Sequence, residues 1–246
     1  MSKNTLTVVE PHFEFLTTPE TMKDLIPLIE LAGRTCYKSE DKVHDDSAER
    51  FIANIMKRGH LSVIEHGSVT VKYVCSRACS HQLVRHRIAA YSQESQRYCD
   101  YSSDKRGDGG LHIIVPPSIG GITIPEGVWY KNPDGVWDKR GGMFSSGAPK
   151  RFFDSVLRAY QDYIALREEG IPAEDARFLL PNACKTEVTT TFNLRQWYHV
   201  FEHRALNPKA QWELRGITLG ILGEFARHLP CIFGNLNALV NEEHKR

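Results

Sequence analysis

Glycine is concentrated in one stretch of the chain, and this stretch limits what the middle of the protein can form. Ten of the 18 glycines lie within residues 101–149. Glycine is unfavourable inside helices but permits tight turns, so we expect no long helix there. Trp129 and Trp137 lie in the same stretch, and polar, flexible linkers seldom carry tryptophan. We therefore expect a Gly-rich excursion of loops and a hairpin on a folded domain. It contains three short apolar patches, at 111–115, 119–124 and 128–130.

Outside this stretch, hydrophobic periodicity and boundary residues predict helices joined by a few strands. The predicted strands cover 6–9, 68–74 and 187–192, and the predicted helices cover 22–32, 47–58, 77–86, 149–169, 172–177, 193–205 and 207–229. Asp46 and Glu49 predict a capping box. Ser76 and Asn193 are favourable N-caps for two later helices. These elements predict an α+β fold, a single domain over residues 1–246 with a small mixed or antiparallel sheet and several long helices.

Composition excludes several classes of protein. The chain has 31 Lys and Arg against 30 Asp and Glu, a formal charge of +1, whereas nucleic-acid-binding modules usually carry a basic excess. No segment approaches the ~18 apolar residues of a membrane span, and the first residues lack the pattern of a signal peptide. Six scattered cysteines fit reduced thiols better than a disulfide framework. We expect a cytoplasmic protein that binds neither nucleic acid nor a membrane.

Familiar cofactor and metal motifs are missing or incomplete. No G-x-G-x-x-G follows a predicted strand, which argues against a Rossmann dinucleotide site. The stretch 142–150 resembles a P-loop, but Ala148 and Pro149 separate its second glycine from the lysine. Possible zinc ligands occur without a C-x2-C pair at Cys75, Cys79, His81 and His86. Buried thiols and hydrogen-bonded histidines explain them more simply than a metal site, so we expect no metal.

The strongest candidate for a binding site is the segment 82–98. It combines cations with small polar residues, namely Arg85, His86, Arg87 and Arg97 with Gln82, Ser92, Gln93 and Ser95. Guanidinium groups and hydroxyls hold phosphate oxygens by charge-assisted hydrogen bonds. A run of cations is often only a solvated basic face, but here acidic partners are almost absent. Gln82 and Arg85 would share a helix face, while the chain from Arg87 onward is expected to be extended. The segment predicts an anion site at a helix end.

The same residues resemble the signature of a known family. Arg85-His86-Arg87-x7-Ser95-x-Arg97 resembles the R-H-R-x2-S-x4-S-x-R signature of the flavin-dependent thymidylate synthases, with Ala90 in place of the first serine. The resemblance covers most of the chain outside 101–149. Further segments are similar in the same order, at Arg58 to His66, Ala176-Arg177-x3-Pro181, Asn193-x-Arg195-x3-His199-x4-Arg204 and Ala210 to Glu213.

This resemblance implies an enzyme that methylates dUMP to dTMP. In the family, 5,10-methylenetetrahydrofolate supplies the carbon, and FAD reduced by NADPH supplies the hydride. The resemblance also implies a homotetramer whose active sites are shared between subunits.

The resemblance assigns a role to individual residues. The FAD-binding residues that it implies are His60, Ser62, Arg85, His86, Arg87, Gln93, Asn193, Arg195 and His199. The dUMP-binding residues that it implies are Gln82, Arg85, Gln93, Ser95, Arg97, Arg177 and Arg204. Arg204 is the implied catalytic residue, because a fixed cation beside uracil would stabilise the negative charge that spreads over N3 and O4.

Two alternatives stay open from the residues alone. One is a nucleotide-binding flavoprotein of different chemistry, and the other is a nucleic-acid-binding module that uses the arginine-histidine cluster. A bound flavin would exclude the second, and dependence on dUMP would exclude the first.

Overall fold

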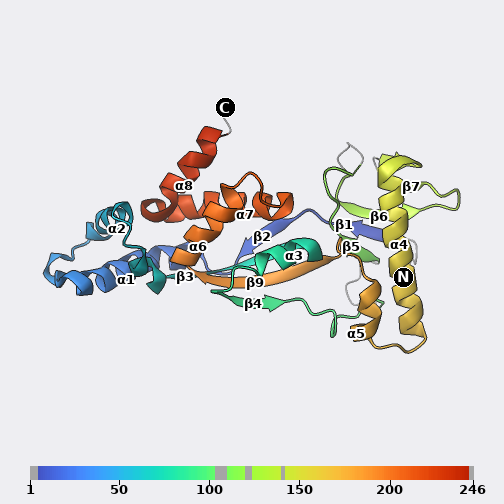
Figure 1. Cartoon of the computed structure of the whole chain (residues 1–246), viewed down its shortest axis with the longest axis horizontal. Coiled ribbons are helices and arrows are strands. Elements are labelled where there is room, and N and C mark those ends of the chain that lie inside the picture. The colour runs from blue at the N-terminus through green and yellow to red at the C-terminus, as the bar shows by residue number, and fades with distance from the viewer. Residues whose placement is uncertain (1–4, 103–109, 120–123, 140–141, 244–246) are drawn as a thin grey trace. The chain divides into compact units, whose positions relative to one another are not determined.

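The computed structural model describes residues 5–102, 110–119, 124–139 and 142–243 (Figure 1). The chain divides into two compact units, each assembled from separate segments. Unit 1 comprises Met1–Pro11, Val74–Ser80 and Gln93–Glu187, and unit 2 comprises His12–Tyr73, His81–Ser92 and Val188–Arg246. Both contain strands and helices, so the predicted α+β class is confirmed. The expectation of a single domain over residues 1–246 stays a prediction.

Unit 1 is built on a five-stranded sheet. Its strands, in spatial order, are β5 (Leu111–Ile113), β1 (Thr5–Val8), β6 (Gly127–Lys131), β7 (Trp137–Lys139) and β8 (Gly142–Phe144). β1 is parallel to β5, and the other neighbours are antiparallel. The hairpin expected in the Gly-rich stretch is therefore present. That stretch is more than an excursion, however, because it supplies four of the five strands. The apolar patch at 119–124 falls largely outside the described residues.

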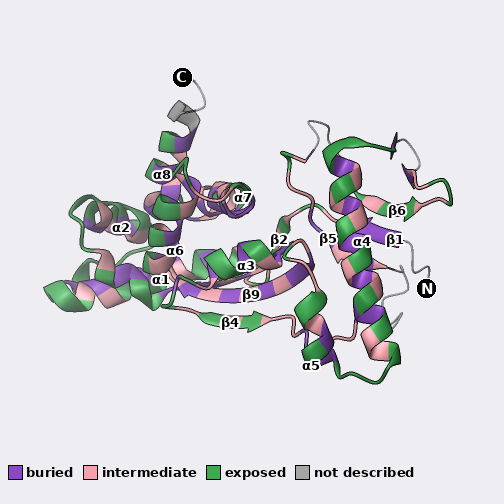
Figure 2. Cartoon of the chain, turned by 45° about the vertical axis from the view of Figure 1, so that its right-hand side comes forward, coloured by how far each residue is buried: buried purple, intermediate pink, exposed green. Residues whose placement is uncertain are grey.

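The two tryptophans of the Gly-rich stretch explain why it folds. Trp129 and Trp137 are almost fully buried, and their ring centroids lie 5.7 and 5.1 Å from that of Phe153. Phe153 belongs to α4 (Gly147–Glu168), whose buried side is purple in Figure 2. Burying aromatic rings of this size is among the largest apolar contributions available to a small core. The tryptophans thus hold short, glycine-interrupted strands against one long helix.

Unit 2 carries most of the second sheet. Its order is β2 (His12–Phe15), β3 (Ser68–Ser76), β9 (Lys185–Asn193) and β4 (Ala90–Gln93). The last residues of β3 and β4 and the first residues of β9 belong to unit 1. The helices of unit 2 are α1 (Pro19–Tyr37), α2 (Ser47–Lys57), α6 (Leu194–Val200), α7 (Trp212–His228) and α8 (Pro230–Glu243). Trp197, Phe225 and Phe233 form its aromatic core, with successive ring centroids 5.1 and 5.0 Å apart. No helix in the described ranges is long and apolar enough to cross a membrane.

Two predicted N-caps are confirmed. The Ser76 hydroxyl accepts a hydrogen bond of 3.1 Å from the backbone N–H of Cys79, at the start of α3 (Arg77–Leu83). Asn193 Oδ1 accepts one of 2.8 Å from the N–H of Gln196, at the start of α6. Each cap satisfies a backbone donor that would otherwise lack a partner in the first turn. Both long strands therefore pass directly into helices.

Other predicted boundaries are wrong, and each has a local cause. The Asp46 side chain makes no capping bond; the neighbouring Ser47 hydroxyl bonds instead to the N–H and carbonyl of His44. The helix predicted from residue 207 begins at Trp212, because Gln211 provides the cap through a 2.8 Å bond to the N–H of Leu214. The predicted end of this helix before Pro230 is confirmed, because α7 ends at His228, but a further helix, α8, was not predicted. It begins at Pro230, where the missing N–H of proline costs nothing.

A buried carboxylate, Glu30 of α1, pairs with Arg34 of the same helix and connects α1 to α2 in unit 2. Glu30 is 2% exposed and accepts bonds of 3.1 and 2.8 Å from Nε and Nη2 of Arg34. The hydroxyl of Ser47 donates to the other oxygen of Glu30 at 2.7 Å. The Arg34 guanidinium also lies 4.3 Å from the centroid of the Phe51 ring. The carboxylate is thus fully paired although it is buried.

We expect Glu30→Ala to lower the free energy of unfolding by about 3 kcal/mol, because it leaves Arg34 with a buried charge and no carboxylate. The matched control is Arg227→Ala, which removes a helical pair with Glu224 from a side chain that is 66% exposed; this change should cost less than about 1 kcal/mol. Urea denaturation of the two variants measures the difference. Equal losses would contradict a structural role for the Glu30 network.

Candidate functional site

The turn after α3 brings His86 into the interior of unit 2. α3 ends at Leu83, and the Tyr91 hydroxyl then contacts the carbonyl oxygens of Leu83 and His86 at 2.9 and 2.6 Å. These contacts fix the turn, and His86 is only 6% exposed. The expectation that Gln82 and Arg85 share a helix face is wrong, because Arg85 lies in the turn beyond the helix end.

Arg204 reaches the same place from the other half of the chain. It lies in a π-helical segment, Phe201–Ala205, that continues α6. Its Nε donates to Nε2 of His86 at 2.9 Å, and its Nη2 donates to the carbonyl of Gln82 at 3.4 Å. An arginine side chain has donors and no acceptor, so Nε2 of His86 must be unprotonated. Wider π-helical turns are frequent at functional sites, and this one carries the residue with the implied catalytic role.

Histidine rings surround this contact. The ring centroid of His86 lies 5.7 Å from that of His199, and that of His199 lies 4.2 Å from that of His203. Burial, followed by the charges of Arg204 and the two other histidines, lowers the pKa of His86 from 6.5 to about 4. Burial and His203 also lower the pKa of His199. At neutral pH, His86 is therefore a neutral acceptor beside a permanent cation.

The other FAD residues implied for unit 2 fall into two groups. Asn193 is occupied as the α6 cap, and Arg195 pairs with Glu65 of the 3-10 helix Leu61–His66. His60 Nδ1 lies 2.6 Å from the Tyr37 hydroxyl, with the two rings stacked. Both Arg195 and His60 are exposed, and so are the three residues of the second group, Ser62, Arg85 and Arg87. Neither Arg85 nor Arg87 has a carboxylate partner within the described part of the chain.

Three of the implied substrate residues belong to unit 1 and lie in segments that Glu174 links, namely Ser95, Arg97 and Arg177. Arg97 Nε donates to Glu174 Oε2 at 2.9 Å, and Arg177 Nε donates to the Glu174 carbonyl at 3.0 Å. The backbone N–H of Arg97 also donates to the Ser95 hydroxyl at 3.2 Å. Ser95, Arg97 and Arg177 are thus brought together, and their role in binding substrate stays a prediction. Glu174, from α5 (Ala173–Ala176), was missed because no local pattern marks a partner 77 residues away.

A buried network holds the segment that carries Gln93 and Ser95. Lys185, 5% exposed, lies 3.3 Å from Glu94 and 2.6 Å from Glu187. Tyr101 donates to Glu94 at 2.9 Å, and Gln93 Nε2 donates to the Ser80 hydroxyl at 3.0 Å. Neither Glu94 nor Lys185 was among the residues predicted for the site. They anchor the end of β4, from which the substrate segment continues.

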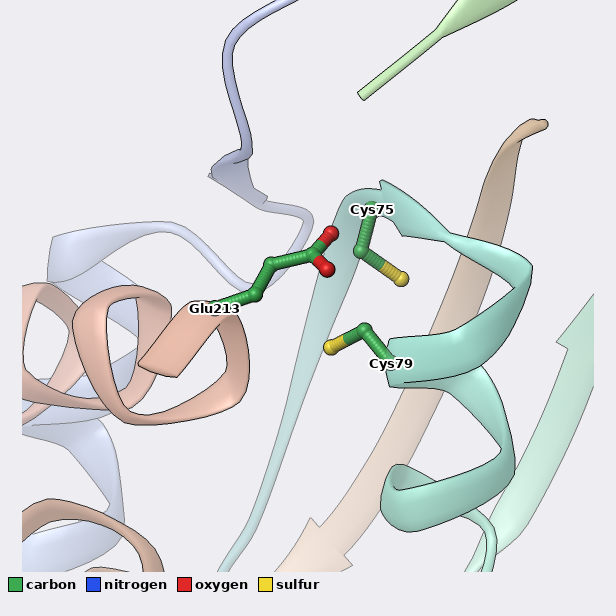
Figure 3. A group of neighbouring side chains, drawn as sticks. All are labelled: Cys75, Cys79 and Glu213. Carbon is green, nitrogen blue, oxygen red and sulfur yellow. The ribbon is translucent and has the colours of Figure 1, made fainter. Parts of the chain in front are cut away.

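The thiols do not form a complete metal centre within unit 1. Cys75, at the end of β3, and Cys79, in the first turn of α3, have their sulfur atoms within 4.8 Å of each other (Figure 3). Both are fully buried, and Figure 3 also labels Glu213, which comes from α7 of unit 2. A structural zinc site needs four ligands, and two thiols supply half of them. The expectation that the protein uses no metal stays a prediction.

The exposed guanidinium groups of Arg85 and Arg87 are suited to binding phosphate oxygens. A family model described as thymidylate synthase complementing protein matches residues 20–231. A flavin-dependent thymidylate synthase of Geobacter sulfurreducens is 38% identical over 213 residues, which cover 83% of this chain and 79% of the relative. One of Nitratidesulfovibrio vulgaris is 34% identical over 247 residues, covering 93% and 88%. The chain belongs to the flavin-dependent thymidylate synthase family, and the predicted resemblance is confirmed.

A solved structure supports the fold independently. The UMP/dUMP methylase PolB of Streptomyces cacaoi, bound with 5-Br dUMP, matches with a TM-score of 0.67 over 95% of this chain and 97% of that chain. At 20% identity, this similarity concerns the fold alone.

The low pKa of His86 predicts a pH dependence of stability. Between about pH 6.5 and 4, the unfolded chain binds a proton at this histidine and the folded chain does not, so stability falls as the pH falls through this window. We expect the melting temperature to drop between pH 7 and pH 4.5, and to drop less in His86→Gln, which cannot titrate. The lowered pKa of His199 also makes stability fall as the pH falls, in wild type and in His86→Gln alike. Equal pH slopes for wild type and variant would contradict the burial of a neutral His86.

Proposed function

We propose that this protein converts dUMP to dTMP by reductive methylation, with 5,10-methylenetetrahydrofolate as carbon donor and FAD, reduced by NADPH, as hydride carrier. Membership of the family supports the reaction. The observation that carries the proposal is the contact of Arg204 with neutral His86. It leaves the guanidinium with its full charge and with unused N–H donors. A cation held in this way can stabilise negative charge as it develops on a bound ring.

For the cofactor, the residues present fit the group. Arg85 and Arg87 are exposed, and among the described residues neither has a carboxylate partner, so their forks suit the diphosphate of FAD. We propose that they hold it together with Ser62, Asn193, Arg195, His199 and His60, and with Gln93 of unit 1. FAD, when bound, supplies the hydride. The protein's part is to bind the cofactor, orient it and exclude water.

For the substrate, Ser95, Arg97 and Arg177 are proposed to hold the phosphate, with Gln82, Arg85 and Gln93 as further contacts. The pair of Arg97 with Glu174 is about half exposed on both sides, and such pairs are worth little in water. A phosphate can therefore replace the carboxylate at Arg97 at small cost. Arg204 is proposed to face the uracil and to make its C5 nucleophilic.

No cysteine is needed for this route. Burial, with a smaller effect of nearby Glu94, raises the pKa of Cys184 to about 12, and burial with Glu49 does the same for Cys231. Cys75 and Cys79 are fully buried. A nucleophilic thiol must be an accessible thiolate, so these four are unsuitable. We therefore propose that dUMP is activated by electrostatics alone.

We further propose that the protein forms a homotetramer with shared active sites. It is proposed to have no nucleic-acid partner. The cytoplasmic location expected from the sequence stays a prediction.

We expect the purified protein to contain FAD or to take it up, with a flavin absorbance spectrum, and to oxidise NADPH faster when dUMP is added. The physical reason is the pair of unpartnered arginines on the turn after α3. Absorbance titration with FAD and an NADPH assay with and without dUMP make the measurement. A preparation whose spectrum does not respond to FAD would exclude the proposal, and NADPH oxidation indifferent to dUMP would favour a flavoprotein of different chemistry.

Arg204→Ala should lower dTMP formation by roughly 100-fold, about 2.7 kcal/mol, as for removal of one donor from an oxyanion hole. Arg204→Lys should recover only part of this, because an ammonium has no planar fork and no Nε donor for His86. Both variants should remain folded and take up FAD, and Arg204→Ala should lower the melting temperature moderately, because it leaves the buried Nε2 of His86 without its donor. Normal turnover in Arg204→Ala would rule out its catalytic role.

A further inference from the structure

His86 has a hydrogen-bond partner that its expected role does not explain. The resemblance assigns it to FAD, yet its Nε2 is occupied by Nε of Arg204 at 2.9 Å. We propose that His86 is a positioning residue, which fixes the guanidinium of Arg204 in the plane and direction that the substrate requires. This inference rests on the proposed role of Arg204 in activating dUMP.

His86 is itself immobile enough to serve as an anchor. Its backbone N–H donates to the Leu83 carbonyl at 3.2 Å, and its own carbonyl accepts from the Tyr91 hydroxyl at 2.6 Å. Its ring is buried and meets the ring of His199 edge to face at a centroid distance of 5.7 Å. The backbone and the ring are therefore both fixed before Arg204 makes contact.

The contact uses one edge of the guanidinium and leaves the other available. Nε is bound to His86 and Nη2 contacts the Gln82 carbonyl, so the inner edge faces two acceptors, one in the last turn of α3 and one just after the helix. An arginine has five N–H donors in a rigid fork. The N–H groups that remain lie at the outer edge, where a planar acceptor such as a pyrimidine carbonyl can meet them. An acceptor on the inner edge thus determines where the outer edge points.

The direction of the Arg204 guanidinium depends both on the π-helical segment that carries it and on the turn after α3 that carries His86. Arg204 is the fourth residue of Phe201–Ala205, and a π turn contains more residues than an α turn, so it shifts the angular position of those residues. The arginine is long and flexible, and the helix alone does not hold its end. His86 supplies the second constraint, from a segment 118 residues earlier.

Two amide variants distinguish the role of the Nε2 acceptor atom from that of the imidazole ring of His86. In His86→Gln, an acceptor oxygen can lie near the position of Nε2, whereas in His86→Asn it lies near Nδ1, out of reach of Arg204. We expect His86→Gln to keep dTMP formation within about threefold of wild type, and His86→Asn to lose at least about tenfold, or 1.4 kcal/mol. FAD affinity, measured by flavin absorbance titration, should be similar in the two.

A double-mutant cycle with Arg204→Ala tests whether His86 acts through Arg204. If it does, His86→Asn should cause little further loss of turnover once Arg204→Ala is present, because coupled residues are not additive. Fully additive losses, or a loss of FAD binding with normal turnover at saturating FAD, would overturn the proposal. Equal losses in His86→Gln and His86→Asn would also overturn it.

The same cycle measured by urea unfolding of the FAD-free protein separates this inference from the proposed function. One outcome is that the effects of His86→Asn and Arg204→Ala on stability are coupled while the wild-type protein forms no dTMP. That result would support the contact between His86 and Arg204 and reject the proposed reaction. Wild-type dTMP formation without any coupling in stability or turnover would reject the positioning role and leave the reaction standing.

Discussion

The contact between His86 and Arg204 depends on two transitions in which a long strand passes into a capped helix. β3 ends at Ser76, whose hydroxyl caps α3, and the short helix then delivers the chain to the turn that carries His86. β9 ends at Asn193, which caps α6, and α6 continues into the π-helical segment that carries Arg204. In each case the cap sets the residue at which the helix begins, and therefore the direction of every side chain after it. A shift of one residue at either cap would rotate the helix by about 100°.

These local signals were readable in the sequence, and that is why much of the fold could be predicted. Ser76 and Asn193 are small polar residues placed just before helical periodicity, and capping depends only on the next three residues. Arg85, His86 and Arg87 could be recognised as a candidate site for the same reason, because the cluster is contiguous. The α+β class followed from the order of these elements. Where a boundary prediction was wrong, a nearby side chain made the local hydrogen bond: Ser47 bonds to His44 beside Asp46, and Gln211 caps α7 in place of residue 207.

What the sequence could not supply is pairing over long separations. Glu174 with Arg97, Glu94 with Lys185, and His86 with Arg204 are 77, 91 and 118 residues apart, and no periodicity links them. The Gly-rich stretch illustrates the same limit. Its composition indicated loops and a hairpin correctly, but the sheet it forms is completed by β1, from the first residues of the chain, which pairs with both β5 and β6. Burial of Trp129 and Trp137 against Phe153 of α4 then holds the strands in place. Tertiary packing there overrides the weak local preference of glycine for irregular structure.

The two arginines with the clearest proposed roles are held by partners of opposite kinds. Arg97 is paired with Glu174, an exposed carboxylate whose charge it neutralises. A phosphate carries the same sign of charge and can take the carboxylate's place, so this pairing suits a group that must bind and release an anion. Arg204 is paired instead with an imidazole kept neutral by burial and by Arg204 itself. No carboxylate pairs with Arg204 in the described part of the chain, so its charge is not neutralised within the protein. A carboxylate there would fix the guanidinium equally well but would cancel the field that has to stabilise charge on the substrate. A neutral histidine gives the geometry without that loss.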